Sequence, residues 1–345
     1  MWKNLLTEME LEGYNARDHK GACVLKQKIL LLSTGGTIAS APSKCGLRPE
    51  RTGQDLLTML GSTPYDITVK DILNMDSSNI QPEEWQYIAE QVYQAHNKYD
   101  GIVITHGTDT MAYTASVLTF MLPGITIPVI LTGSQLPMTH PLSDAYSNIH
   151  CALAMAASGI PGIFIAFDRK ILLGCRSVKV RTTSFNAFES INAPIVAMVN
   201  ANGLQLLHSL PFQPKDGCEL KKELDTHVVL VKLIPGIEPS LFRAIVDTGI
   251  HGVVVEAFGS GGLNFMRRDI ASALGILVKQ GIPVVVCSQC LYESSDFTKY
   301  EVGEHALQQG IIPGKDLTTE CAVTKLMWAL GQKMSLEEIG DFFNQ

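Results

Sequence analysis

Short apolar segments alternate along the chain with longer segments in which apolar residues recur every three or four positions. The short segments predict strands, and they lie at 28–33, 67–72, 101–105, 128–132, 162–166, 228–233, 252–255 and 283–287. The longer segments predict helices, for example at 82–96 and 110–121. Strands that are apolar on both faces and are separated by helices are typical of a mainly parallel sheet with helices on each side. The pattern therefore predicts an α/β fold.

The alternation is interrupted at 211–224, where proline, glycine and charged residues cluster between two apolar segments. The length of 345 residues, at roughly 150 residues per domain, favours two domains. We therefore predict a polar lead at 1–27, a large N-terminal domain at 28–212 and a smaller C-terminal α/β domain at 213–345. A capping box of Ser335 and Glu338 predicts the start of the last helix.

The charge and cysteine content exclude several classes of protein. The 27 Lys and Arg against 34 Asp and Glu give a formal net charge of −7, which repels a phosphate backbone, so we predict no nucleic-acid partner. The eight cysteines are scattered, and no second pair completes a zinc site with Cys287 and Cys290, so we interpret them as reduced thiols. Acidic residues interrupt the N-terminal stretch, and no segment reaches the roughly 18 apolar residues of a membrane span. We expect a cytoplasmic protein with no membrane partner.

Glycines and hydroxyl-bearing residues follow four predicted strands of the larger domain. They form the segments TGGTI at 34–38, DSS at 76–78, HGTDT at 106–110 and GSQ at 133–135. The carboxyl ends of parallel strands meet at one edge of a sheet, where open α/β sheets bind their ligands. We therefore expect these segments to form one cleft that is rich in neutral hydrogen-bond donors and acceptors.

Two kinds of chemistry fit such a cleft. Phosphate binding is disfavoured because the usual glycine-rich phosphate-binding patterns are absent and because Asp109 would repel a phosphate. Nucleophilic catalysis by a threonine needs a base, together with backbone N–H groups that stabilise an oxyanion. We interpret His106 as a structural residue packed at a strand end. A lysine can serve as the base where burial disfavours its charge, but the residue types alone do not identify which lysine.

The segments TGGTI at 34–38 and THGTDTM at 105–111 resemble the two signature motifs of the bacterial and archaeal L-asparaginase family. The resemblance extends from about residue 28 to the C-terminus. Within the family the chain is most similar to the cytoplasmic type I and archaeal-like members, through IQPE at 80–83 and FNAFES at 185–190.

This resemblance implies roles for individual residues. Thr37 is expected to be the nucleophile, which attacks a side-chain amide and forms an acyl-enzyme. The residues expected to form the second catalytic group are Thr108, Asp109 and Lys179, the last of these in the R-x-x-K segment 176–179. The implied substrate-binding residues are Gly36, Ser77, Ser78, Thr108, Asp109 and Ser134. No metal or organic cofactor is implied.

The sequence departs from the family pattern at two positions. Leu47 stands where many members carry a loop tyrosine that helps to activate the threonine. Glu256 stands where asparagine-regulated members have an arginine, so regulation by asparagine is not implied. Family sites are completed across a subunit interface, which implies a homodimer or a homotetramer built as a dimer of dimers. The residues that the partner subunit is expected to contribute to each site are Tyr300 and Glu301.

The functional hypothesis is hydrolysis of L-asparagine to L-aspartate and ammonia through an acyl-threonine intermediate. A glutaminase-asparaginase of broader specificity is one alternative, because one methylene changes discrimination by only about 1–3 kcal/mol. A D-type component of an archaeal tRNA-dependent amidotransferase is another, although such chains carry an additional N-terminal domain, for which a lead of about 25 residues is short. A non-enzymatic amino-acid sensor, which would bind without turnover, is the third.

Overall fold

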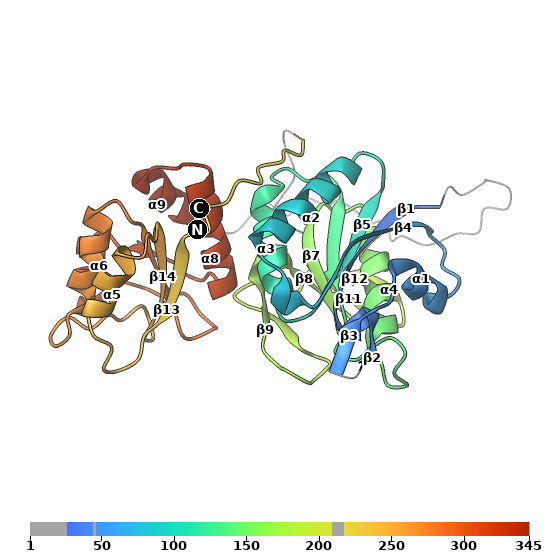
Figure 1. The fold of residues 1–345 in the computed structure, drawn as a ribbon, viewed down its shortest axis with the longest axis horizontal. Coiled ribbons are helices and arrows are strands. Elements are labelled where there is room, and N and C mark those ends of the chain that lie inside the picture. The colour runs from blue at the N-terminus through green and yellow to red at the C-terminus, as the bar shows by residue number, and fades with distance from the viewer. Residues whose placement is uncertain (1–25, 44–45, 209–216, 345) are drawn as a thin grey trace, which may run out of the picture.

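The computed structural model describes residues 26–43, 46–208 and 217–344, which form two α/β domains side by side (Figure 1). The larger domain contains an eight-stranded sheet of order β12-β11-β8-β7-β6-β5-β1-β4. Its parallel strands are β1 (Lys28–Gly35), β4 (Asp66–Met75), β5 (Gly101–Thr105), β6 (Pro128–Thr132) and β7 (Gly162–Phe167). Antiparallel strands continue the sheet at one edge, namely β8 (Lys170–Leu173), β11 (Ala197–Asn200) and β12 (Gly203–Leu206).

Helices cover both faces of this sheet because successive strand residues, such as Ile29 and Leu30 of β1, point into two different apolar cores. One face is covered by α2 (Pro82–Ala95) and α3 (Met111–Met121). The opposite face is covered by α1 (Gly53–Leu60) and α4 (Ala145–Ala156). The large sheet is therefore the central layer of three.

Short elements join this framework and carry several of the predicted site residues. A 3-10 turn at Thr37–Ala39 leads from β1 into a hairpin of β2 (Ser40–Ser43) and β3 (Gly46–Pro49). A second 3-10 turn, at Ser77–Asn79, follows β4. Beyond β8, a third turn at Gly174–Arg176 leads into β9 (Ser177–Lys179), which pairs antiparallel with β10 (Phe188–Ser190).

The strand order places a topological switch point between β1 and β5. Strand β1 pairs with β4 on one side and with β5 on the other, and the chain then continues outward through β6 and β7. Because the connection that leaves β1 and the connection that leaves β5 run in opposite directions across the sheet, a crevice opens at the carboxyl ends of these two strands, where open α/β sheets bind ligands. The segments that follow these two strands are TGGTI and HGTDT.

One crossover connection differs in hand from the others. Helix α3 connects β5 to β6 on one face of the sheet, whereas α4 connects β6 to β7 on the other face, although both connections advance in the same direction. Their hands are therefore opposite. Parallel crossovers are right-handed in about 98% of cases, and the connection through α2 lies on the same face and advances in the same direction as the connection through α3. The β6–α4–β7 connection is therefore the left-handed one. The segment 133–144 thus leads from the carboxyl edge of β6 to the face opposite α3.

The smaller domain contains a four-stranded parallel sheet of order β13-β14-β15-β16. Its strands are β13 (Val228–Lys232), β14 (Gly252–Ala257), β15 (Val284–Ser288) and β16 (Ile312–Pro313). One face is covered by α5 (Ser240–Val246), α6 (Ile270–Lys279) and α7 (Glu301–Gln308). The other face is covered by α8 (Thr319–Gly331) and α9 (Leu336–Asn344).

The two domains contact each other along α8 and beside β9. Helix α8 packs against α3, where the rings of Phe120 and Trp328 lie 6.2 Å apart. Next to β9, the Arg176 guanidinium lies 3.1 Å from the Asp316 carboxylate. The Asn192 side chain donates to the Asp316 carbonyl oxygen at 3.1 Å. The smaller domain is therefore attached to the strand that ends at Lys179.

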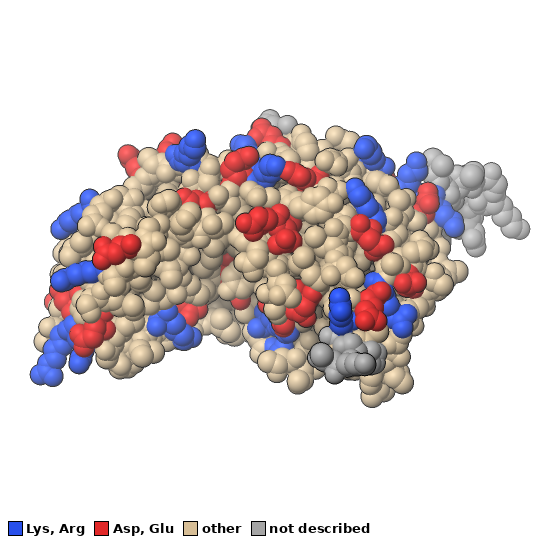
Figure 2. All heavy atoms as spheres, viewed as in Figure 1, with Lys and Arg blue, Asp and Glu red and all other residues tan. Residues whose placement is uncertain are grey.

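The structure confirms the predicted α/β fold, and β5 and β6 have the predicted bounds. The capping box is also confirmed, because the Ser335 N–H donates to Glu338 and the Glu338 N–H donates to Ser335. The predicted boundary between 212 and 213 and most of the polar lead lie outside the described residues, so these limits stay a prediction. No described helix is long and apolar enough to cross a membrane. On the face shown in Figure 2, acidic and basic side chains are interspersed over both domains.

Candidate active site

Three loops meet at the carboxyl ends of β4, β1 and β5. A Cβ atom on Gly36, whose φ is 77°, would lie 2.5 Å from the Gly107 nitrogen. A Cβ atom on Gly107 would lie 2.6 Å from the Ser77 Oγ. Only glycine permits so close an approach, so the Gly36 backbone touches the Gly107 backbone, which in turn packs against the side chain of Ser77. Thr37 and Thr108, which follow the two glycines, consequently lie on adjoining loops.

Lys179 contacts two residues of the HGTDT loop. Its Nζ donates to the Thr108 Oγ1 at 2.7 Å and lies 2.6 Å from the Asp109 Oδ1. The Lys179 side chain is 16% exposed, whereas that of Asp109 is 58% exposed. The fold thus brings together the three residues predicted to form the second catalytic group, with an enclosed ammonium and a carboxylate that opens to solvent.

The two serines after β4 hold the HGTDT loop from the other side. The buried Ser77 Oγ accepts from the Asp109 N–H at 3.2 Å, and the Ser77 carbonyl oxygen accepts from the Thr110 hydroxyl at 2.8 Å. The Ser78 Oγ lies 3.5 Å from the Asp109 Oδ2. The Ser78 N–H donates to the Asp76 carboxylate, so Asp76 caps this turn. Ser77 therefore fixes the loop, and Ser78 faces the carboxylate of Asp109.

The hydroxyl groups of the TGGTI segment differ in their surroundings. Thr34 is fully buried, and its Oγ1 donates to the Thr105 carbonyl oxygen at 2.8 Å, which joins the ends of β1 and β5. Thr37 is half-buried, and its hydroxyl forms no hydrogen bond with any other described residue. The Thr37 hydroxyl is thus available for chemistry, whereas the Thr34 hydroxyl is committed to structure.

Comparison with known proteins assigns a family to this arrangement. Residues 28–211 match the family model of the asparaginase N-terminal domain, and residues 227–343 match that of the glutaminase/asparaginase C-terminal domain. The chain belongs to the asparaginase family. Both the predicted family and the predicted fold are therefore confirmed.

Several asparaginase-family proteins are similar over most of their length. An L-asparaginase from Thermococcus kodakarensis is 45% identical over 318 residues, which are 90% of this chain and 95% of that protein. The D-type component of the glutamyl-tRNA(Gln) amidotransferase from Pyrococcus abyssi is 34% identical, over 90% of this chain and 74% of that protein. The solved thermostable L-asparaginase from Thermococcus kodakarensis superposes with a TM-score of 0.87 at 44% identity, covering 92% of this chain and 97% of that one. L-asparaginase I from Vibrio cholerae superposes with a TM-score of 0.82 at 30% identity, covering 93% and 97%.

Gln135 is a residue of the candidate site that the sequence analysis did not single out. Its side-chain Oε1 lies 3.5 Å from the Thr108 Oγ1. Its Nε2 donates to the carbonyl oxygens of Thr182 and Ser184 at 3.1 Å each. The amide thus connects Thr108 to the segment that follows Lys179. The GSQ segment at a strand end was the signal that located this loop, but it did not distinguish Gln135 from its neighbour.

Ser134, which is predicted to bind substrate, is buried and donates its hydroxyl to the Leu136 carbonyl oxygen at 2.5 Å. Asp144 holds the same loop, because its carboxylate accepts from the N–H of Gln135 at 3.0 Å and from that of Leu136 at 3.2 Å. The Asn148 side chain donates to that carboxylate at 3.0 Å. These bonds fix the loop after β6, while its contact with Thr108 is made by Gln135.

His106 is confirmed as a structural residue. Its ring is fully buried, with Nδ1 2.7 Å from the Gly107 carbonyl oxygen and Nε2 2.9 Å from the Thr114 hydroxyl. Because a carbonyl oxygen can only accept, Nδ1 carries the proton and Nε2 accepts from Thr114, which in turn accepts from the Trp85 indole N–H. Burial lowers the pKa of His106 to about 4, so the ring is neutral at neutral pH.

The residues predicted to act across a subunit interface lie in the smaller domain of this chain, whereas Thr37 lies in the larger domain. Tyr300 precedes α7 and is 54% exposed, and Glu301 is the exposed first residue of that helix.

The two residues that depart from the family pattern are also located. Leu47 lies in β3, where its backbone pairs with that of Pro42 in the hairpin after Thr37. Glu256 accepts from the Thr319 hydroxyl at 2.7 Å at the carboxyl end of β14.

Proposed function

We propose that this asparaginase-family protein hydrolyses L-asparagine to L-aspartate and ammonia through an acyl-threonine intermediate. The observation that carries the proposal is the contact of Lys179 with Thr108 and Asp109 on the loop that adjoins Thr37. The similarity to L-asparaginase from Thermococcus kodakarensis, in sequence and in structure, supports the same activity. The amidotransferase relative shares less identity and extends beyond the matched region, so it gives weaker support to the tRNA-dependent alternative.

In the first half-reaction, the Thr37 Oγ attacks the side-chain amide carbon. A C–O bond forms, the C–N bond breaks, and the proton that leaves the Thr37 hydroxyl ends on the departing ammonia. The backbone N–H groups of the turn that begins at Gly36 can stabilise the oxyanion, because the first N–H groups of a helical turn lack internal acceptors. In the second half-reaction, water attacks the ester and restores the threonine.

Thr108 and Lys179 form the proton relay in this proposal. The Lys179 ammonium donates to the Thr108 oxygen, so the Thr108 proton is directed away from the lysine. Thr108 can therefore donate to the leaving nitrogen while Lys179 replaces its proton, so the nitrogen, which also receives the Thr37 proton, leaves as ammonium and Lys179 is left neutral. In the second half-reaction the neutral Lys179 accepts, through Thr108, a proton from the attacking water, which restores the ammonium. Asp109 holds the lysine in place through the ion pair. A water molecule held by Lys179, or Tyr300 of the partner subunit, takes the role of the loop tyrosine that Leu47 cannot fill.

The substrate is a zwitterion whose two charged groups match this end of the sheet. The exposed carboxylate of Asp109 can pair with the substrate ammonium, because only one of its oxygens faces Lys179. The hydroxyl groups of Ser77 and Ser78 can bind the α-carboxylate. We also propose a cytoplasmic homodimer or dimer of dimers, with Tyr300 and Glu301 of the partner subunit completing each site.

The test is ammonia release from L-asparagine and from L-glutamine by the wild type, by Thr37→Ala and by a matched surface variant, Thr58→Ala. Thr58 is an exposed residue of α1, so its variant is expected to keep full activity. We expect Thr37→Ala to lose at least about a thousandfold in kcat, as for other nucleophiles. A Thr37→Ala variant that kept wild-type ammonia release would refute the nucleophile assignment.

The same assay separates the alternative functions. We expect a kcat/KM for asparagine that exceeds the value for glutamine. Equal values would support a glutaminase-asparaginase instead. Binding of asparagine without ammonia release by the wild type would support an amino-acid sensor, and activity that required tRNA and a second protein chain would support the amidotransferase alternative.

A further inference from the structure

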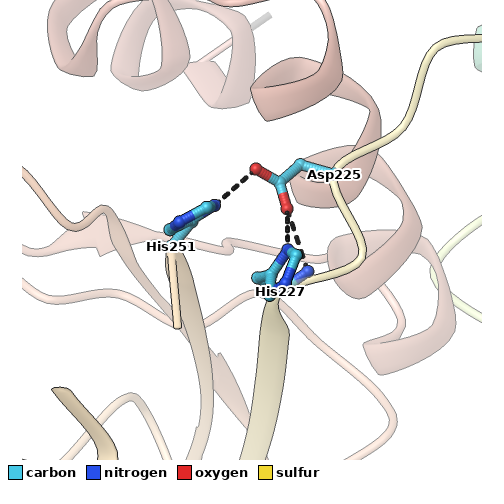
Figure 3. Close-up of side chains that lie close together, drawn as sticks. All are labelled: Asp225, His227 and His251. Atoms are coloured by element: carbon cyan, nitrogen blue, oxygen red, sulfur yellow. Dashed lines mark hydrogen bonds and ion pairs between the residues drawn. The ribbon is translucent and has the colours of Figure 1, made fainter. Parts of the chain in front are cut away.

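Three side chains of types that can bind a metal ion converge at the amino end of the smaller sheet (Figure 3). His227 directly precedes β13 and His251 directly precedes β14. The two strands pair in parallel, with Val228 opposite Gly252, so the two histidines are neighbours although 24 positions separate them in the sequence (251 − 227). Asp225 lies two residues before His227 and completes the group.

The three ligand atoms point toward one another. The Asp225 Oδ1 lies 2.9 Å from the His227 Nδ1, and the Asp225 Oδ2 lies 2.6 Å from the His251 Nδ1. All three ligand atoms lie within 4.8 Å of one another. Figure 3 shows the two rings approaching the carboxylate from adjacent strands.

The backbone that carries this cluster is fixed from several directions. The Asp225 N–H donates to the Met327 carbonyl oxygen on α8 at 2.9 Å. The His251 N–H donates to the His227 carbonyl oxygen at 2.8 Å, and the His227 N–H donates to the Asp225 carboxylate at 2.9 Å. The side chains are freer, since those of His227 and His251 are 59% and 55% exposed. The cluster thus combines a fixed framework with side chains that can adjust.

We propose that Asp225, His227 and His251 bind one divalent transition-metal ion of the zinc type. Two imidazole nitrogens and one carboxylate oxygen are a ligand set that suits Zn²⁺, Co²⁺ or Ni²⁺, whereas Mg²⁺ and Ca²⁺ prefer oxygen ligands. To bind the metal, each ring presents the lone pair of its Nδ1, which now faces the carboxylate, and carries its proton on Nε2 after exchange with solvent. Water completes the coordination on the exposed side.

The observed separations are close to those that such an ion needs. Metal–ligand bonds of about 2.0–2.2 Å in a tetrahedral arrangement place neighbouring ligand atoms roughly 3.3 Å apart. The two carboxylate–imidazole distances of 2.6 and 2.9 Å, which end on different carboxylate oxygens, therefore need to open by less than about 1 Å. The ligand nitrogens of the two rings, which lie within 4.8 Å of each other, need to reach a similar separation. Rotation of two exposed rings is sufficient for this change.

The ion would act on the stability of the smaller domain and not on the chemistry at Thr37. It would link the segment before β13 to β14 and, through the backbone of Asp225, to α8. A ligand that binds only the folded state raises the free energy of unfolding by RT ln(1 + [L]/Kd), and therefore also raises the unfolding temperature. This inference does not depend on the proposed asparaginase activity.

The experiment is calorimetric titration of the chelator-treated full chain with Zn²⁺ alone and, in a separate arm, with Mg²⁺ alone. We expect the wild type to bind one more Zn²⁺ per chain than His227→Gln/His251→Gln and to gain a higher unfolding temperature with the ion. The matched control is His150→Gln/His208→Gln, which removes two exposed histidines elsewhere and is expected to bind Zn²⁺ like the wild type. Co²⁺ absorption spectra report the coordination directly.

Asp225→Asn provides a second variant that keeps both rings and is expected to weaken Zn²⁺ binding at least tenfold. Unchanged ammonia release and unchanged unfolding temperature in the absence of metal show that each variant is folded. Zn²⁺ binding of equal stoichiometry and affinity in the wild type and in the double variant at 227 and 251 would overturn the proposal. So would the absence of Zn²⁺ binding by the wild type, or Mg²⁺ binding as tight as that of Zn²⁺.

Discussion

The buried ring of His106 is expected to make the stability of the larger domain depend on pH. In the folded protein, burial lowers the pKa of this ring from 6.5 to about 4. The unfolded chain therefore binds a proton that the folded chain does not, over the interval between these two values. The contribution of His106 to the free energy of unfolding is fully present above about pH 6.5 and decreases as the pH falls toward 4. Below that pH the contribution does not decrease further.

The magnitude follows from the two pKa values. Between about pH 8 and about pH 4.5, the contribution of His106 to the free energy of unfolding decreases by about 2.5 kcal/mol. A loss of this size is a large part of the stability of a typical domain. It acts on the loop that carries Thr108 and Asp109, because the His106 ring donates to the Gly107 carbonyl oxygen at the start of that loop.

Urea unfolding followed by circular dichroism at a series of pH values measures this effect. We compare the wild type with His106→Asn, whose amide can still donate to Gly107 but does not titrate, and with His150→Asn, which changes an exposed histidine on α4. The His106 variant is expected to be less stable at neutral pH and to have a pH profile that is flatter by about 2.5 kcal/mol. Identical slopes in the His106 variant and the wild type would refute the reasoning, and a flat profile in the His150 variant would show that the effect is not specific.

Three further predictions concern individual side chains. Lys179→Met removes the donor to Thr108 and is expected to lower kcat by about 10²–10⁴-fold with little change in the circular dichroism spectrum; retained activity would remove the lysine from the relay. Gln135→Glu directs a carboxylate at two carbonyl oxygens, so its kcat/KM is expected to fall about 10- to 100-fold. Steady-state assays of Gln135→Glu and Gln135→Met are expected to show the larger loss of kcat/KM in the glutamate variant. Burial raises the pKa of Cys287 to about 12, whereas Cys290 is exposed. Iodoacetamide at mildly alkaline pH is therefore expected to label Cys290 first, which peptide mass spectrometry measures. Faster labelling of Cys287 would contradict its burial.

The strands that carry the site could be predicted because their signals are local. An apolar run that ends in glycine and threonine indicates both a buried strand and its carboxyl end, so Thr37 and Thr108 could be assigned to one edge before the contact between Gly36 and Gly107 was known. The short antiparallel strands β8, β11 and β12 could not be predicted, because a strand of only four residues gives too short an alternation to recognise. His227 and His251 were missed for a different reason: parallel pairing, and not sequence spacing, makes them neighbours.

The position of Gln135 depends on a feature that no local pattern encodes. The rule of right-handed crossovers predicts that the chain returns from β6 on the face of α3. Instead, α4 packs on the opposite face, and Asp144 holds the loop between them by accepting from the N–H of Gln135. With that loop fixed across the carboxyl edge, the Gln135 amide reaches both Thr108 and the segment after Lys179. Gln135 thus lies at the start of the one connection of unusual hand, and the bond from its N–H to Asp144 helps to hold its amide beside Thr108.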